Sequence, residues 1–350
     1  MTEPDRLSRR SFIQTTSLGM GTGVVAATTG NASSAAMRPD SREGRLPREV
    51  WVASICQAGL SATSPSDMIG KILRRMEETV PMQPDVICLP ECLHVANQPN
   101  RPPLTESAEV PIGSISRPFA EFARRHRCNI ICPIFTQEAG RFYNAAVVID
   151  RHGRYVGEYR KINPTEGELK KGITPGPIDP PVFQLDFGTI GVQICFDINW
   201  HENWKRLAAK GVEIIFWPSA FAGGEMLNAL AWINKVYIVS STRIQATKIV
   251  DVLGDDVVST GRFGEWICSP INLDVAVVQG YQYMRKLDRA RAKYGRRINV
   301  KTKHVEAWAA LESLAADVSV PKILKEFDIE TSRDMLARNT QLQNAKRPKF

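Results

Sequence analysis

The sequence predicts an α/β protein in which two mixed sheets stack face to face, with helices on the outer face of each sheet. Short, continuous apolar runs at 85–91 and 129–135 are typical of buried strands. Amphipathic helical patterns alternate with such runs, and two similar hairpin patterns, at 144–159 and 246–261, occur in the two halves of the chain. Stacking sheet on sheet would bury both apolar faces.

The first elements follow from local patterns. Residues 48–60 (REVWVASICQAGL) are rich in β-branched and apolar residues and predict a strand. A helix is expected to begin after Ser64, because serine is a favourable N-cap and Pro65 suits the first helical position. Its apolar residues form one stripe at helical spacing, namely Met68, Ile72, Leu73 and Met76.

The remaining elements continue this alternation. A Pro-rich loop at 93–115 separates the strand at 85–91 from a helix marked by Phe119, Phe122 and Ala123. The segment 183–195 (FQLDFGTIGVQIC) predicts another hairpin that turns at Gly188, and a helix follows it. From residue 282 to 350 the chain is charged and helical in pattern, so we expect a domain at 48–281 and a helical C-terminal extension.

The N-terminal residues 1–36 have the layout of an export signal. Arg9 and Arg10 precede Phe12 and a weakly apolar stretch that ends in small residues near Ala36. Paired arginines are typical of the twin-arginine export machinery, which predicts an exported, periplasmic or extracytoplasmic protein. Residues 37–47 are polar and are expected to form a loose segment.

The composition excludes several classes of protein. Apolar residues make up 43% and charged residues 23%, as in ordinary globular proteins, and 45 Lys and Arg residues are balanced by 37 Asp and Glu residues. The one dense basic run, at 285–303, indicates a solvated helix face, so no nucleic-acid partner is expected. No run in the mature chain has the length and apolar character of a membrane span. The seven cysteines lack zinc-site spacing, so we expect no disulfide framework, no metal and no other cofactor.

Residues able to do chemistry follow three of the predicted strands. Glu91 ends the motif LPE, Lys161 lies in YRKINPTEGE, and Cys195 ends TIGVQIC. The carboxyl ends of parallel strands meet at one edge of a sheet, where ligands bind in open α/β folds. A thiol becomes a nucleophile when a base takes its proton and donors meet the oxyanion that it creates. The three residues are therefore expected to converge in one site.

The motifs VICLPE, YRKINPTEGE and GVQICFDINWHENW, in this order, resemble the nitrilase or carbon–nitrogen hydrolase superfamily. The resemblance runs from about Glu49 to Gly280 and includes YNAAVVID around Asn144 and GVEIIFWPSA at 211–220. It implies a four-layer αββα sandwich that usually dimerises and that uses neither a metal nor an organic cofactor.

The resemblance also implies roles for individual residues. The general base falls on Glu91, the lysine that stabilises the oxyanion on Lys161 and the nucleophile on Cys195. A second active-site glutamate falls best on Glu168, while Glu166, two residues away, stays open.

Three further positions complete the expected site. The main-chain N–H of Phe196 is a natural second donor to the oxyanion. Asn144 and Trp217 are expected among the residues that bind the oxyanion or the substrate.

The activity that the resemblance implies is hydrolysis of an amide or N-carbamoyl compound through a cysteine thioester. The sequence CFD with Trp200 and Glu202 after it favours the amidase and carbamoylase branches, whereas RKINPTEGE favours nitrilases. The membrane-bound acyltransferase branch is disfavoured because spanning helices are not expected. An exported binding protein that uses the same cleft without turnover is the alternative of another class.

The partners expected are a small amide, carbamoyl or nitrile substrate and further copies of the chain. Trp200 and Trp204 lie on the short helix that follows Cys195, which in the family lies at the subunit interface. We therefore expect a homodimer or a larger homo-oligomer.

Overall fold

The computed structural model describes residues 44–348, which belong to one compact unit. The expected signal at 1–36 and most of the loose segment at 37–47 lie outside the described residues.

The first sheet has seven strands in the order β13-β1-β2-β4-β5-β6, with β3 paired to β4. Strands β1, β2 and β4 are parallel, and β4, β5 and β6 form an antiparallel meander, so β6 runs in the same direction as β2. The hairpin expected at 144–159 is the β5-β6 pair. The strands are β1 (Glu49–Ile55), β2 (Val86–Cys88), β3 (Ala108–Glu109), β4 (Asn129–Glu138), β5 (Arg141–Ile149), β6 (Tyr155–Arg160) and β13 (Trp266–Asn272).

The second sheet has six strands in the order β12-β11-β10-β9-β8-β7. Its centre, β8, β9 and β10, is parallel, and antiparallel hairpins at either edge correspond to the two expected at 183–195 and 246–261. The strands are β7 (Phe183–Leu185), β8 (Gly188–Val192), β9 (Ile214–Ser219), β10 (Tyr237–Thr242), β11 (Lys248–Val250) and β12 (Asp256–Ser259).

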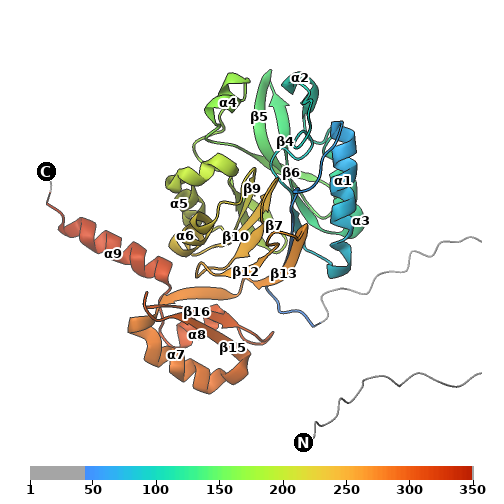
Figure 1. Cartoon of the computed structure of the whole chain (residues 1–350). Helices are drawn as coiled ribbons and strands as arrows, with labels where there is room; N and C mark the ends of the chain where they lie inside the picture. The colour runs from blue at the N-terminus through green and yellow to red at the C-terminus, as the bar shows by residue number, and fades with distance from the viewer. Residues whose placement is uncertain (1–43, 349–350) are drawn as a thin grey trace, which may run out of the picture. The chain divides into compact units, whose positions relative to one another are not determined.

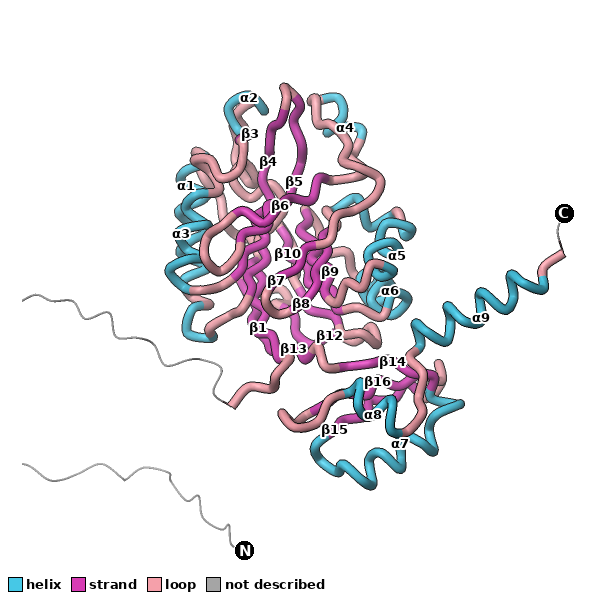
Figure 2. Tube along the Cα trace, turned by 180° about the vertical axis from the view of Figure 1, so that it is seen from behind, coloured by secondary structure: helices cyan, strands magenta, loops and turns pink. Residues whose placement is uncertain are grey.

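Helices flank the two sheets on opposite sides (Figures 1 and 2). Helices α1 (Pro65–Glu77) and α3 (Arg117–His126) cover the first sheet, and α5 (His201–Ala209) and α6 (Glu225–Asn234) cover the second. The Ser64 side chain caps α1 by accepting from the Asp67 amide at 3.2 Å, as its sequence predicts. Short helices lie in the connections, namely η1 (Val80–Met82), α2 (Leu104–Ser107), α4 (Glu166–Lys170) and η2 (Cys195–Asn199).

Three apolar clusters fill the spaces between these layers. One joins the facing sides of the two sheets, with Val148 and Phe216 among its members. A second packs α1 and α3 on the first sheet, and a third packs α5 and α6 on the second. The layers are therefore helix, sheet, sheet, helix, which confirms the predicted α/β sandwich.

The C-terminal segment corrects one part of the sequence prediction. A third sheet, ordered β14-β16-β15, begins at Val275, before the boundary expected at 282, and two of its strands lie inside the extension expected to be helical. The strand INVKTK alternates apolar with polar residues, so its signal was hidden among charges. The elements are β14 (Val275–Gln279), α7 (Gly280–Tyr294), η3 (Gly295–Arg297), β15 (Ile298–Lys303), β16 (Trp308–Ser313), α8 (Val320–Glu326) and α9 (Ser332–Lys346).

This segment has a core of its own and packs on the sandwich through apolar residues, such as Val277 and Ala310, and through polar contacts. Leu287 and Leu311 are fully buried in a fourth apolar cluster. The Asn272 side chain donates to the Ser313 carbonyl at 2.6 Å, and Lys301 pairs with Asp251 at 2.6 Å. Within residues 44–348, no helix combines the length and the apolar character that crossing a membrane requires.

Candidate active site

The three residues predicted to converge do so at one edge of the sandwich. Glu91 follows β2, Lys161 follows β6 and Cys195 follows β8, each within three residues of its strand's carboxyl end. All three line a cavity of about 580 Å³. The sheets are joined near this edge by hydrogen bonds from Ser54 Oγ to the Ser240 carbonyl and from Ser241 Oγ to the Ile55 carbonyl, both 2.6 Å long.

Lys161 lies between two carboxylates. Its Nζ donates to Glu91 Oε1 at 3.0 Å and to Glu168 Oε2 at 2.8 Å, and only 1% of the residue is exposed. Burial favours the neutral amine, but the negative charges of Glu91 and Glu168 outweigh it and raise the pKa of Lys161. An ammonium group has three N–H donors, so one remains for a third acceptor.

Asn144 forms hydrogen bonds with the same two carboxylates. Its Nδ2 donates to Glu91 Oε1 at 2.9 Å and to Glu168 Oε1 at 2.7 Å. Its Oδ1 accepts from the Cys92 thiol at 3.4 Å, which orients the amide. Asn144 is 1% exposed and is not among the residues that line the cavity, so it contacts the two carboxylates from outside the cavity.

The second carboxylate oxygen of Glu91, Oε2, is available to react. Among the described residues, Glu91 Oε2 accepts no hydrogen bond, and Arg243 Nη2 lies 3.6 Å from it. Arg243 follows β10 and also lines the cavity. Because Lys161 and Asn144 both bind Oε1, Oε2 is the oxygen that can take a proton.

The structure brings Glu168, and not Glu166, into the site. Thr165 and Glu168 form a capping box at the start of α4, in which Glu168 Oε2 accepts from the Thr165 amide at 2.8 Å. Burial raises the pKa of Glu168, but the Lys161 ammonium lowers this pKa by more, so the net shift is downward. Glu166 is exposed and pairs with Lys170 at 2.5 Å. The T-x-x-E spacing was the sequence signal that distinguishes the two.

Cys195 is the first residue of η2, three residues after β8, and its backbone is strained. Its φ is 48°, in the left-handed region that non-glycine residues adopt at a cost of about 1–3 kcal/mol. The residue is 8% exposed, and burial together with the charge of Glu91 raises the pKa of its thiol to about 11. Lys161 and hydrogen bonds from the Ala220 amide and the Ser219 hydroxyl act in the opposite direction. The resting thiol is therefore protonated near neutral pH and needs a base.

Asp197 and Trp217 hold this turn in place. Asp197 is fully buried and accepts from Tyr159 Oη at 2.7 Å and from the Ile194 amide at 3.1 Å. It also accepts from the Asn163 amide at 2.8 Å, which ties the chain after Lys161 to the chain around Cys195. Trp217 Nε1 donates to the Cys195 carbonyl at 3.1 Å.

Two further residues were expected to bind the oxyanion or the substrate, and of these only Trp217 differs from the prediction. Trp217 is fully buried against α5 and α6 and does not line the cavity, because alternation along β9 turns its side chain away from the other sheet. The Phe196 side chain is 37% exposed, and no described backbone hydrogen bond uses the N–H of Phe196. That amide remains free to donate.

Sequence reasoning missed Cys92 and Arg243 in the cavity and Asp197 behind it. Arg243 follows the apolar run VYIVSST and so carries the same strand-end signal as Glu91. Cys92 has φ 47° and faces Asn144, which the sequence does not reveal. All seven cysteines are free, and the described residues contain no cluster of three His, Cys, Asp or Glu side chains placed to bind a metal ion.

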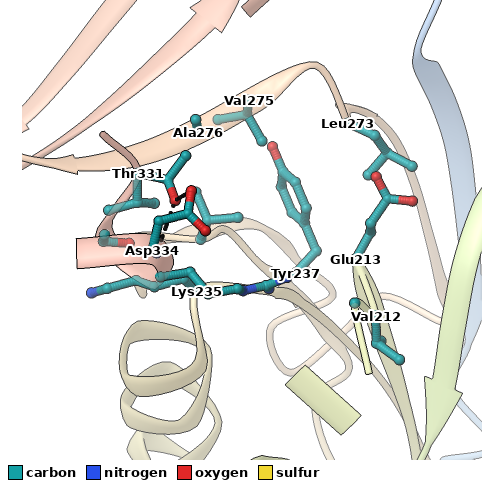
Figure 3. A pocket seen from close by; sticks show the side chains of 14 residues that line it. Val212, Glu213, Lys235, Tyr237, Leu273, Val275, Ala276, Thr331 and Asp334 are labelled. Carbon is teal, nitrogen blue, oxygen red and sulfur yellow. Dashed lines mark hydrogen bonds between the residues drawn. The ribbon is translucent and has the colours of Figure 1, made fainter. Parts of the chain in front are cut away.

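A second cavity, of about 380 Å³, lies at the opposite ends of β9 and β10. Figure 3 shows Glu213, Tyr237 and Lys235 on one side of it and residues of the C-terminal segment, including Val275 and Asp334, on the other. None of the residues that line it is a cysteine or a histidine.

Comparison with known proteins agrees with this architecture. Residues 52–283 match the family model described as carbon-nitrogen hydrolase. The chain is 28% identical over 203 residues to a nitrilase of Pyrococcus abyssi, an alignment that covers 57% of this chain and 77% of that protein. It is also 28% identical to a beta-ureidopropionase of Arabidopsis thaliana, over 54% of this chain but only 50% of the plant protein.

Solved structures share the fold at low sequence identity. Nit3 of Saccharomyces cerevisiae, a member of branch 10 of the nitrilase superfamily, superposes with a TM-score of 0.57 at 20% identity, over 65% of this chain and 91% of its own. An amidase from Nesterenkonia sp. gives a TM-score of 0.57 at 17% identity, over 70% of this chain and 96% of its own.

Proposed function

Because the chain belongs to the carbon-nitrogen hydrolase family, we propose that it cleaves the C–N bond of an amide or N-carbamoyl compound through a thioester on Cys195. The observation that carries this proposal is the arrangement of a thiol, a buried ammonium and two carboxylates around one cavity. A mutant Nesterenkonia amidase that binds the acetamide moiety of fluoroacetamide covalently at its active-site cysteine supports the same role for Cys195.

The first half of the reaction forms the thioester. Glu91 Oε2 takes the thiol proton as Cys195 Sγ attacks the carbonyl carbon, because a thiol with a pKa of about 11 needs a base near neutral pH. The remaining N–H of Lys161 and the Phe196 amide donate to the oxyanion. As the C–N bond breaks, Glu91 gives its proton to the leaving nitrogen.

The second half releases the acid. Water attacks the thioester while Glu91 accepts its proton, and the C–S bond then breaks. The proton returns from Glu91 to the sulfur, which restores the thiol. Glu168 accepts a hydrogen bond from Lys161, and Asn144 donates to both Glu91 and Glu168. These contacts keep Lys161 and Glu91 in place throughout the reaction.

Nitrile hydrolysis is the second candidate, favoured by the 28% identity to a nitrilase. The same cysteine would attack the nitrile carbon to form a thioimidate, and water would convert it to acid and ammonia. Measuring ammonia release from matched amides, N-carbamoyl compounds and nitriles distinguishes the two. Tight binding without turnover in every class would instead support a non-catalytic binding protein.

We also propose that Arg9 and Arg10 direct export of the folded chain by the twin-arginine route. The support is the sequence pattern alone, since these residues lie outside the described part of the chain. Replacing both with lysine should leave the precursor in the cytoplasm. Unchanged recovery outside the cytoplasmic membrane would contradict the proposal.

We propose a homodimer or a larger oligomer, but only one of the two tryptophans expected at its interface is exposed. Trp204 is fully buried within the chain, so it cannot contribute to an interface, whereas Trp200 is 41% exposed and stacks edge to face on Phe196. A light-scattering mass near 39 kDa at micromolar concentration would contradict an oligomer.

A further inference from the structure

The cavity at Cys195 carries more positive than negative side chains. Four basic residues line it, namely Arg101, Lys161, Lys171 and Arg243, against two acidic ones, Glu91 and Glu168. Lys161 and Arg243 form ion pairs with these carboxylates. Arg101 and Lys171 make no ion pair and no side-chain hydrogen bond with any described residue, which leaves two positive charges without a partner.

The two unpaired cations come from different segments. Arg101 lies in the Pro-rich loop between β2 and α2. Lys171 is the residue that follows α4, three positions after Glu168, so it lies on the face of this helix that turns toward the cavity. The neighbouring Lys170 does not line the cavity and pairs with Glu166 at the exposed surface.

Apolar side chains occupy most of the remaining wall. They are Val95, Pro102, Pro103, Leu104, Phe135, Ile173 and Ala220. A molecule that reaches from Cys195 past this wall would place hydrocarbon against it. Any group that it carries beyond the hydrocarbon meets a positive potential, because a cleft with apolar walls focuses the field of its charges.

We infer that this site selects substrates that bear a carboxylate at the end opposite the scissile C–N bond, bound by Arg101 and Lys171. The inference rests on the proposed hydrolase and specifies its substrate class. A neutral amide of the same size gains nothing from these two cations, and a cationic amide is repelled by them.

The test compares pairs of substrates that differ only in this charge. The pairs are succinamate with succinamide, glutaramate with glutaramide and adipamate with adipamide, in which a carboxamide replaces the carboxylate. In at least one pair, kcat/KM for ammonia release should be roughly tenfold or more higher for the carboxylate, the scale of one charge-assisted hydrogen bond. Arg101→Gln and Lys171→Gln should each remove most of that preference, because kcat/KM should fall more for the carboxylate than for its diamide.

Lys170→Gln is the matched control, since it removes a positive charge one residue away and outside the cavity. It should leave the preference within about twofold of the wild-type value, because exposed ion pairs contribute little. Equal kcat/KM for both members of every pair, or equal losses in Lys170→Gln and Lys171→Gln, would overturn the inference while leaving the hydrolase intact.

A binding measurement keeps the two proposals separate. Cys195→Ala protein is titrated calorimetrically with the three carboxylates and the three diamides. Tighter binding of a carboxylate that Lys171→Gln abolishes supports the anion site even if the wild-type protein hydrolyses none of the six. In that case the proposed hydrolysis fails and the binding site stands.

Discussion

The two ends of strands β9 and β10 border different cavities, and each cavity has a lysine among the residues that line it. At the carboxyl end, Lys161 contacts two carboxylates, and its pKa is raised although the residue is almost fully buried. At the amino end, Lys235 forms no ion pair with a described residue and lies 3.5 Å from the ring of Trp232. Burial lowers the pKa of Lys235 to about 8. The charged partners of each lysine, and not burial alone, therefore set the direction in which its pKa shifts.

The comparison also distinguishes a candidate active site from a cavity that lacks a nucleophilic thiol. The cavity at the carboxyl end contains a thiol, an acceptor oxygen without a hydrogen bond and a lysine with an unused donor, all from strand ends. The cavity at the amino end has a lysine and two carboxylates among the residues that line it but no nucleophilic thiol. The following changes test this distinction.

The largest effect is expected from Cys195→Ala. It should lower kcat/KM by at least about 10⁴-fold, as removal of a catalytic nucleophile does elsewhere, while the melting temperature changes little. Cys88→Ala is the control, because Cys88 is fully buried in the core between the sheets. It should cost about 1 kcal/mol of unfolding free energy and leave turnover intact.

The second change compares the two lysines. Lys161→Met should lower kcat by about 100-fold or more through loss of an oxyanion donor, and it should destabilise the fold because two carboxylates lose their shared cation. Lys235→Met should leave kcat within about twofold of wild type and keep or raise stability, because an apolar group replaces an unpaired amine. Steady-state kinetics and thermal melting measure both. Equal losses of kcat would remove the distinction between the two ends.

A smaller effect concerns pH. The pKa of Glu168 is lower in the folded protein than its ordinary value of 4.5, so its ion pair stabilises the fold above pH 4.5 and loses this contribution as the pH falls through the folded value. The difference in unfolding free energy between wild type and Glu168→Gln should therefore shrink from pH 6 to pH 3. The denaturation curves of Glu166→Gln should follow wild type throughout, since Glu166 is exposed. A difference independent of pH for Glu168→Gln would contradict its pairing with Lys161.

Strand-end residues were predictable, and side chains within strands were not. Glu91, Lys161 and Cys195 each follow a predicted strand, and the carboxyl ends of parallel strands meet at one edge of a sheet, so their convergence could be expected from the sequence. Trp217 lies inside β9, where a shift of one residue exchanges the two faces, and the sequence does not show which face meets the helices.

Residues in irregular loops and the strands of the third sheet could not be predicted from the sequence either. Arg101 reaches the cavity from a loop without regular structure, so no periodic pattern places it. Strand β15 carries polar residues that resemble a solvated helix when read in sequence, and the Ala and Leu residues of β16 favour helices. Only the pairing of β16 with β14 and β15 shows that they form a sheet.

The central claim, that Cys195 is the nucleophile, is tested most directly by alkylation. Wild-type protein is treated briefly with iodoacetamide at several pH values, and residual activity is compared with the alkylated fraction of each cysteine from peptide mass mapping. Activity should fall in proportion to the alkylated fraction of Cys195 and reach zero when Cys195 is fully alkylated, while Cys92 and the five other thiols stay unmodified. Full activity with Cys195 completely alkylated, or inactivation that follows labelling of Cys92 instead, would contradict the account.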